Sequence, residues 1–319
     1  MPEQNLIERL DELVEAILAG RQTAPVVDAD LATLGAVAAD LRDLPRPDFK
    51  AQLRKKFAPE EETMSATATS VKEGFRTVTP YFVVDGADRF IEFMKQAFEA
   101  RPRDRHLRPD GTVMHADVRI GDSMVELADH TKQYPVVTMG MHLYVDDVDA
   151  VYAQAVRAGA TTLIGLTDQP YGDREASIAD PFGNHWYIAT HQATGSRPEG
   201  FSSITPFLHP KGADRLMEFV ERAFGATVLE RHAGADGAIA HGVVRIGDSL
   251  LELSEAHGQW GPMPANIHLY VEDADAVYER ALAAGGTSLY PVTDFPYGER
   301  GGGVTDPFGN NWFMATPNR

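Results

Sequence analysis

The segment HADVRIGDSMVEL at residues 115–127 returns as HGVVRIGDSLLEL at residues 241–253. Each copy consists of two short strand-like runs joined by Gly-Asp, a strong signal for a β-hairpin. The offset of 126 residues extends well beyond the hairpin: residues 75–193 align with residues 201–319 without a gap, and about 54 of the 119 paired positions are identical. Stacked repeats have periods of only about 20–50 residues. The sequence therefore contains one domain twice, and a residue kept in both copies has been sampled twice.

Each copy has a two-part internal pattern. A strand-like run at residues 78–84 leads into a helix with Phe90, Phe93 and Phe98 on one face, and three short strand-like runs follow. The same succession restarts at residues 141–145 and occurs again, complete, in the second copy. We therefore predict an α+β fold in which each copy is a pair of βαβββ modules.

Composition excludes several classes of function. The formal net charge of −18 argues against nucleic acid and anionic membrane surfaces as partners, because these need clustered Lys and Arg. The absence of cysteine excludes disulfides, thiolate nucleophiles and Cys-based zinc sites. No phosphate-binding loop or nucleophile elbow occurs, so we expect no nucleotide cofactor and no serine hydrolase chemistry. The polar, acidic start MPEQNLIERLDE has no apolar run, which favours a cytoplasmic protein without a membrane span.

The chain divides into four segments. Residues 1–63 have apolar positions at helical spacing and are predicted to form a helical region. Residues 64–74 are rich in Ser, Thr and Ala and are predicted to be a linker. Residues 75–195 and 196–319 are the two repeated domains. The helical region has no catalytic constellation, and we leave open whether it packs on itself, on the repeats, on another copy or on a partner protein.

Several blocks within the repeats carry a resemblance to a known family. In the first copy they are TPYFVVDGADRFIEFMKQAF (79–98), HADVRIGDSMVEL (115–127), MHLYVDDVDAVYAQAVRAGA (141–160) and YGDREASIADPFGNHW (171–186). Each has a counterpart 126 residues later. In this order they resemble the vicinal oxygen chelate superfamily of glyoxalases, bleomycin-resistance proteins and extradiol dioxygenases, and most of all its PhnB-like branch. The resemblance covers both repeats and leaves the helical region unexplained.

The resemblance implies a fold of two tandem glyoxalase-like domains, each a pair of βαβββ modules that form a cup-shaped mixed sheet. In this superfamily a cup often forms across two domains, so we expect the repeats to form an internal pseudo-dimer. Whether residues of the two repeats mix within one cup stays open at this point.

The resemblance also implies a divalent metal ion held by one ligand from each of four strands. Two of the four positions match in each copy, namely a fourth-strand glutamate and a fifth-strand histidine: Glu126, His142, Glu252 and His268. Glutamate and histidine are common ligands of Zn, Fe, Mn and Ni. The other two positions fall on threonine and on aromatic residues, so half of the expected ligand set is present.

Strand parity adds one histidine per copy to this set. Side chains alternate between the faces of a strand, so if Met114, Ala116 and Val118 pack under the helices, His115 and Asp117 face the cup. The second copy places His241 and Glu252 alike, and the full set of candidate metal ligands is His115, Glu126, His142, His241, Glu252 and His268. A plainer interpretation is that these histidines only hydrogen-bond their neighbours, and that Glu126 pairs with Arg119 and Glu252 with Arg245 across the hairpins.

Four further residues are candidates for contact with a substrate. Tyr144 and Tyr270 face the cups by strand parity, and Arg174 and Arg300 lie in the repeated motifs PYGDR and PYGER. An arginine can grip an anionic or carbonyl substrate through two hydrogen bonds, although a structural role is at least as open.

Some chemistry-bearing residues differ between the copies. His185 is replaced by asparagine in the second copy, Asp117 by Val243, and His209 occurs only in the second copy. By parity His185 is expected in the first cup and His209 in the second. The two cups are therefore predicted to be unequal.

Two functions of different classes remain. The first is a metal-dependent lyase, isomerase or dioxygenase that acts on a small oxygen-rich substrate, with Glu126 and Glu252 as ligand or catalytic base. The second is a metal-free protein that binds and sequesters a small molecule such as an antibiotic or toxin. A third, in which the cups are vestigial and the helical region docks a partner, predicts a large exposed apolar face on those helices. The sequence names neither the substrate nor the metal.

Overall fold

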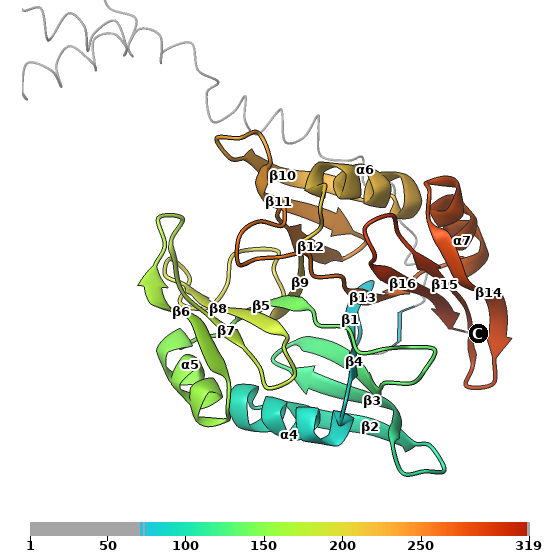
Figure 1. The fold of residues 1–319 in the computed structure, drawn as a ribbon, viewed down its shortest axis with the longest axis horizontal. Coiled ribbons are helices and arrows are strands. Elements are labelled where there is room, and N and C mark those ends of the chain that lie inside the picture. The colour runs from blue at the N-terminus through green and yellow to red at the C-terminus, as the bar shows by residue number, and fades with distance from the viewer. Residues whose placement is uncertain (1–70, 73, 318–319) are drawn as a thin grey trace, which may run out of the picture. The chain divides into compact units, whose positions relative to one another are not determined.

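A computed structural model describes residues 71–72 and 74–317, and the predictions for residues 1–63 and for most of the linker lie outside these described residues. The elements (Figure 1) are β1 (Val78–Val84), α4 (Ala87–Phe98), β2 (Arg101–Leu107), β3 (Val113–Ile120), β4 (Ser123–Asp129), β5 (Gly140–Tyr144), α5 (Val148–Arg157), β6 (Thr161–Asp168), β7 (Asp173–Ala179), β8 (His185–His191), β9 (Ile204–Leu208), α6 (Ala213–Phe224), β10 (Thr227–Ala233), β11 (Ile239–Ile246), β12 (Ser249–Leu253), β13 (Asn266–Tyr270), α7 (Ala274–Ala283), β14 (Thr287–Phe295), β15 (Glu299–Thr305) and β16 (Asn311–Pro317).

These elements form four modules of strand, helix and three strands, which confirms the predicted α+β class. The first repeat contributes β1–β4 with α4 and β5–β8 with α5. The second repeat contributes β9–β12 with α6 and β13–β16 with α7. Among the described residues, no helix is both long enough and apolar enough to cross a membrane.

The modules combine between the repeats rather than within them. The first sheet has the strand order β14-β15-β16-β13-β1-β4-β3-β2, and the second has β10-β11-β12-β9-β5-β8-β7-β6. The repeats meet where β1 runs antiparallel to β13 and where β5 runs antiparallel to β9. Each sheet therefore takes one module from each repeat (Figure 1), which resolves the question that the sequence left open.

The helices show the opposite arrangement and connect the two sheets. Within the first repeat α4 packs beside α5, and within the second α6 packs beside α7. The ring of Phe98 in α4 lies 4.6 Å from that of Trp186 in β8, and Phe224 in α6 lies 4.6 Å from Trp312 in β16. Because each of these helices reaches a strand of the opposite sheet, the two sheets share one apolar core.

Strand parity predicts most of this core correctly. Ala116 and Val118 are buried in it, as are Phe90 and Phe93 on α4. Met114 is an error of the prediction, since its side chain is 50% exposed. The register of β2 with β3 shifts at this point, from His106 opposite His115 to Leu107 opposite Val113, which leaves residue 114 unpaired. Such a bulge interrupts the alternation, and Val113 takes the core position instead.

The hairpin turns fasten each repeat to the start of the other. In the turn between β11 and β12, a carboxylate oxygen of Asp248 accepts a hydrogen bond from the backbone N–H of Thr77 at 2.9 Å. The hydroxyl of Ser249 accepts one from the backbone N–H of Val78 at 3.0 Å. Satisfied backbone groups of this kind fix where β1 begins beside the opposite repeat.

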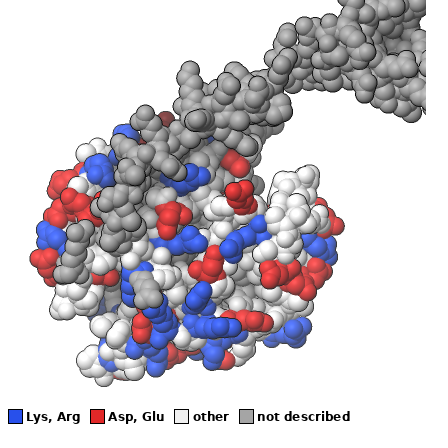
Figure 2. Space-filling model, turned by 180° about the vertical axis from the view of Figure 1, so that it is seen from behind, with Lys and Arg blue, Asp and Glu red and all other residues white. Residues whose placement is uncertain are grey.

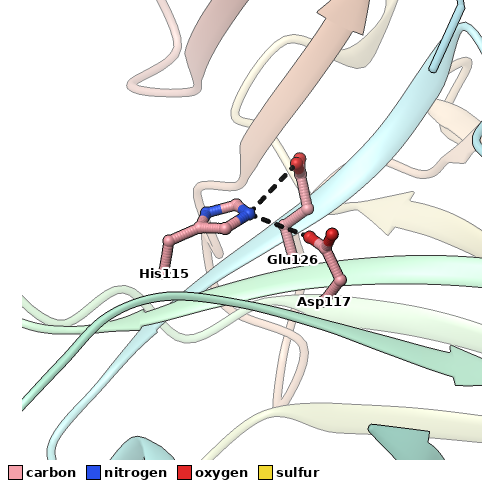
Figure 3. A group of neighbouring side chains, drawn as sticks. All are labelled: His115, Asp117 and Glu126. Carbon is pink, nitrogen blue, oxygen red and sulfur yellow. Dashed lines mark hydrogen bonds and ion pairs between the residues drawn. The ribbon is translucent and has the colours of Figure 1, made fainter. Parts of the chain in front are cut away.

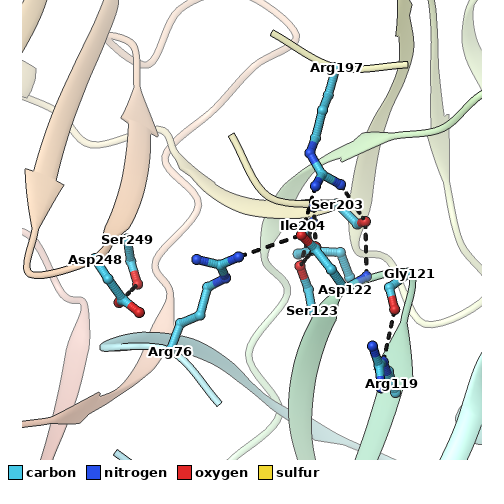
Figure 4. A network of polar contacts seen from close by, with 10 residues as sticks. All are labelled: Arg76, Arg119, Gly121, Asp122, Ser123, Arg197, Ser203, Ile204, Asp248 and Ser249. Carbon is cyan, nitrogen blue, oxygen red and sulfur yellow. Dashed lines mark hydrogen bonds and ion pairs between the residues drawn. The ribbon is translucent and has the colours of Figure 1, made fainter. Parts of the chain in front are cut away.

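The equivalent turn between β3 and β4 makes the same contacts and adds two arginines (Figure 4). A carboxylate oxygen of Asp122 accepts the backbone N–H of Ser203 at 2.8 Å. The other oxygen lies 3.0 Å from Arg197 and 3.5 Å from Arg76, so arginines from both repeats converge on one carboxylate.

A mutation of Gly247 tests this contact between a hairpin turn and the start of the opposite repeat. Its φ is +57°, and a Cβ built on it collides with the Thr77 side chain. Gly247→Ala is expected to cost about 2–4 kcal/mol, because left-handed strain of roughly 1–2 kcal/mol adds to overpacking.

The matched control is Gly225→Ala, with φ +68° and no atom within 4 Å of the added Cβ. It should cost only about 1 kcal/mol, since it carries the strain alone. Urea denaturation of both variants measures the difference in the free energy of unfolding. Equal losses of stability would show that the contact between the turn and the opposite repeat does not depend on the close approach of Gly247 to Thr77.

Candidate active sites

Site 1 is the polar cluster around Glu126 in the first sheet. Its neighbours Val125 and Leu127 belong to the core, so Glu126 points to the opposite face. The side chain is buried, and one carboxylate oxygen lies 2.6 Å from Nδ1 of His268. The other oxygen accepts a hydrogen bond from the hydroxyl of Tyr270 at 3.2 Å. Glutamate comes from the first repeat and both partners from the second, because β1 and β13 are neighbours.

Three side chains of site 1 form a compact group of metal-ligating type (Figure 3). Nε2 of His115 lies 2.8 Å from Asp117 and 3.8 Å from Glu126. One donor atom from each of the three falls within 4.8 Å of the others, and in the part of the chain that the structure describes this is the one such group. Nζ of Lys72 lies 2.8 Å from Oδ2 of Asp117, the carboxylate oxygen that does not face His115. The Tyr81 hydroxyl lies 3.4 Å from Nδ1 of His115.

Site 2 is the corresponding cluster around Glu252 in the second sheet. Glu252 is buried, with one oxygen 2.9 Å from Nδ1 of His142 and the other 3.1 Å from Nε2 of His241. Val243 occupies the position that Asp117 has in site 1. Site 2 thus retains the carboxylate–imidazole pair but lacks a carboxylate at the position of Asp117.

Both glutamate–histidine pairs are electrostatically coupled. Burial alone would raise the pKa of Glu252, but the adjacent imidazoles of His142 and His241 lower it to about 2. Burial alone would lower the pKa of His142, and the Glu252 carboxylate instead raises it above its usual value. Glu126 raises the pKa of His268 against burial in the same manner. These imidazoles therefore favour the charged form beside their carboxylates.

Comparison with protein families decides the identity of the fold. The family model of the Glyoxalase/Bleomycin resistance protein/Dioxygenase superfamily matches residues 76–188 and 208–314. The chain belongs to this superfamily.

Individual proteins are similar to different shares of the chain. The chain is 41% identical over 122 residues to the uncharacterized protein Mb0911c of Mycobacterium bovis, over 35% of this chain and 80% of that protein. It is 30% identical over 187 residues to "Putative glyoxylase CFP32" of the same organism, over 55% of this chain and 68% of that protein. Glyoxalase I from Zea mays has the same fold, with a TM-score of 0.60 at 17% identity over 75% of this chain and 92% of the maize chain.

The predicted substrate-contacting residues of this superfamily protein fall into two groups. Tyr270 and Tyr144 lie in the two sites. Arg174 and Arg300 do not, because they form ion pairs of 2.6 Å with aspartates in α5 and α7 on the helix-covered side. Acidic and basic side chains are intermixed in this way on the face of the molecule shown in Figure 2. The predicted pairing of Glu126 with Arg119 is also absent, since Arg119 donates to the backbone of its own turn.

His185 and His209 share one site, contrary to the separate cups expected from parity. They do so because β8 and β9 flank β5 in the second sheet. The two nitrogens of His209 lie 2.7 Å from the Tyr187 hydroxyl and 2.9 Å from the Ser254 hydroxyl. The module exchange, which parity within one repeat does not reveal, accounts for this correction.

Sequence reasoning missed three acidic residues in the sites of this glyoxalase-superfamily chain. Asp173 accepts the hydroxyl of Tyr144 at 3.0 Å and lies 2.6 Å from Nδ1 of His191. Glu175 in site 2 and Glu299 in site 1 have carboxyl pKa values that burial raises above the usual range. Strand parity on β7 could have identified such residues. Because Arg174 faces helix α5, its neighbours Asp173 and Glu175 must point to the opposite face of the sheet.

Proposed function

We propose that site 1 is a divalent-metal-dependent active site for a small oxygen-rich substrate, with lyase, isomerase or dioxygenase chemistry. The observation that carries the proposal is the group of His115, Asp117 and Glu126, whose donor atoms lie within 4.8 Å of one another. Imidazole and carboxylate suit Zn, Fe, Mn and Ni, and three protein ligands leave positions open for a substrate. His268 stands beside the second oxygen of Glu126 and orients that carboxylate.

The surroundings of these three side chains support the assignment. The Tyr81 hydroxyl engages Nδ1 of His115, which leaves Nε2 directed at the two carboxylates. Orientation of a ligating imidazole through its other nitrogen is typical of metal sites. Lys72 offsets the charge of Asp117, so that the group is not two bare carboxylates.

Glu126 is the proposed catalytic base of site 1. A bound metal ion supplies Lewis acidity, which polarises substrate oxygens and stabilises the negative charge that develops on them. Glu126 can then take a proton from the substrate, and the N–H at Nδ1 of His268, 2.6 Å away, holds its carboxylate in place for that step. Glu299 interacts electrostatically with His268 and Glu126 and has a raised pKa, which makes it the candidate proton donor.

For site 2 we propose the alternative function, binding of a small molecule without a metal. Two observations favour a site without a metal. Val243 stands where site 1 has Asp117, and no set of three donors within 4.8 Å exists there among the described residues. Nε2 of His142 is buried and has no hydrogen-bond partner in the described chain, so it is available to contact a bound molecule. Glu252 would hold His142 in place for that role.

Metal content tests both assignments at once. Untagged protein purified without chelators is expected to hold about one equivalent of a divalent metal by plasma mass spectrometry. Asp117→Val, which gives site 1 the residue of site 2, is expected to weaken metal affinity by about 100-fold or more, since even outer contacts of a metal site are worth about 10–100-fold.

The matched control is His241→Asn, a substitution at the equivalent of His115 in site 2. It should leave the metal content and the metal-dependent rise in Tm unchanged. Protein that holds no metal, or loses it equally in both variants, would contradict the proposal for site 1.

A further inference from the structure

The edge of the sheet that holds site 1 carries a cluster of basic residues. The edge strand β2 reads RPRDRHL and begins with three arginines in five residues. Lys72 and Arg76 lie beside the neighbouring hairpin, 2.8 Å from Asp117 and 3.5 Å from Asp122. A chain with a net charge of −18 is not expected by composition to gather its cations in this way.

The second sheet lacks this basic edge. Four of the basic residues have neutral counterparts 126 residues later: Lys72, Arg76, Arg101 and Arg103 correspond to Pro198, Ser202, Thr227 and Leu229. Charged side chains on an edge strand discourage pairing with other chains. However, β10 is the edge strand of the second sheet and has a single arginine, so protection of an edge does not account for the arginines of β2.

The sheet register brings two of these arginines into direct opposition. Arg101 on β2 lies opposite Arg119 on β3, and both side chains are exposed. Like charges that face each other on neighbouring strands destabilise a sheet. Arg101 has no hydrogen bond or ion pair with any described residue, and the Arg119 side chain donates only from Nε, to the carbonyl of Gly121 at 2.9 Å. Most of the donors of this pair are therefore available to a ligand.

The arginine pair lies on the same face of the sheet as site 1. Arg119 is two residues from Asp117 on β3, and side chains two residues apart on a strand point to the same side. At a rise of about 3.4 Å per residue, the two positions are roughly 7 Å apart. Arg105 faces the other way, since it lies opposite the core residue Ala116 and forms an ion pair with Asp88 in α4.

The other cations near site 1 already have acidic partners. Arg76 and Arg119 both lie beside the turn between β3 and β4 (Figure 4), but the guanidinium of Arg76 is directed at Asp122. Lys72 is held by Asp117 in the same manner. A guanidinium group binds a carboxylate or phosphate through two parallel hydrogen bonds. An anion between Arg101 and Arg119 would also remove the repulsion between them.

We propose that the substrate of site 1 is a small anion whose phosphate or carboxylate group binds between Arg101 and Arg119. Its other oxygen atoms then reach the group of His115, Asp117 and Glu126, at a distance that a short molecule spans. The inference rests on the function proposed for site 1 and adds the charge of its substrate. The second sheet has Thr227 opposite Arg245 and lacks such a pair.

The test is titration of the full chain with inorganic phosphate, followed by phosphorus NMR at low ionic strength because salt screens exposed charges. Arg101→Thr, which introduces the residue of the second repeat, is expected to weaken phosphate binding about 10-fold, since the lost contact is charge-assisted. The matched control Arg105→Thr removes the same charge from the helix-facing side of β2 and should change the affinity less than about 2-fold. Competition by malonate shows whether the pair prefers a carboxylate to a phosphate, and the proposal holds with either.

Two further measurements separate this proposal from a structural role and from the metal. Arg101→Thr should have a urea midpoint equal to or above that of the wild type, because it relieves the opposition of like charges. Asp117→Val, which is expected to lose the metal, should bind phosphate at least as tightly as the wild type. No phosphate binding, equal losses in the two arginine variants, a lower midpoint in Arg101→Thr, or loss of phosphate in Asp117→Val would each overturn the proposal. Metal content reports on the function proposed for site 1 and phosphate affinity on the arginine pair, so the two can fail separately.

Discussion

A fragment of residues 64–195, which holds the first repeat alone, is expected to be a homodimer with twice the mass of one copy. In the intact chain β1 has β4 on one side and β13 on the other, and β5 lies between β8 and β9. The fragment keeps β4 and β8 but loses β13 and β9. Two apolar strand edges are then exposed, and such edges pair with another chain when one is present.

A second copy of the fragment offers the strand that each edge lacks. The β5 of one copy corresponds to β13 and can pair with the β1 of the other, because 54 of 119 positions are identical between the repeats. The two contacts are related by a twofold axis, which closes the assembly at two copies. Light scattering coupled to size exclusion at low micromolar concentration measures the mass. A folded monomer, with native circular dichroism, would refute the exchange of modules.

Glu252→Gln is expected to lower the free energy of unfolding at pH 7 by about 3 kcal/mol, because removal of one partner strands a buried charge. The wild-type pair has a defined pH window. Glu252 has a pKa of about 2 in the folded chain against an ordinary 4.5, so its contribution is present above about pH 4.5 and is lost as pH falls toward 2. The folded pKa of His142 is raised above 6.5, so its contribution is complete below that pH and is lost as pH rises through the raised value.

The variant should remove both limbs of this pH dependence and leave a flatter stability curve between about pH 2 and 9. Urea titrations at pH intervals across this range measure it. The matched control is Glu230→Gln, an exposed carboxylate 3.3 Å from His232 and 3.8 Å from His241, which should cost about 0.5 kcal/mol or less. If the two variants lose similar stability, the buried pair does not stabilise the fold as argued.

Local features of the fold could be predicted from sequence, but the partnering of modules could not. Alternation located Ala116 and Val118 in the core, and it failed at Met114 because a bulge is set by pairing with β2, not by β3 itself. Pairing of β1 with β5 or with β13 would bury the same apolar pattern, since both strands read as His-Leu-Tyr flanked by apolar residues. Two nearly identical partners give a sequence-based argument no means to choose between them.

The candidate sites show the same division. Parity and the family resemblance together indicated that Glu126 and a fifth-strand histidine share a face, and the structure places them 2.6 Å apart. That histidine is His268 of the second repeat, a choice decided by the strand exchange. Asp117 was recognised as facing inward, but its place beside His115 and Glu126 depended on geometry across two strands.

The exchange also bears on how the two sites could have become different. In a twofold assembly of identical chains, one codon sets the same position in both sites. A substitution that improves one site therefore also changes the other. Fusion of the two copies into one chain gives each position a codon of its own. Only a fused gene can encode different residues at equivalent positions, such as Asp117 and Val243 or His185 and Asn311. Yet each site still draws residues from both repeats, so neither half of the gene can be lost or replaced without damage to both sites.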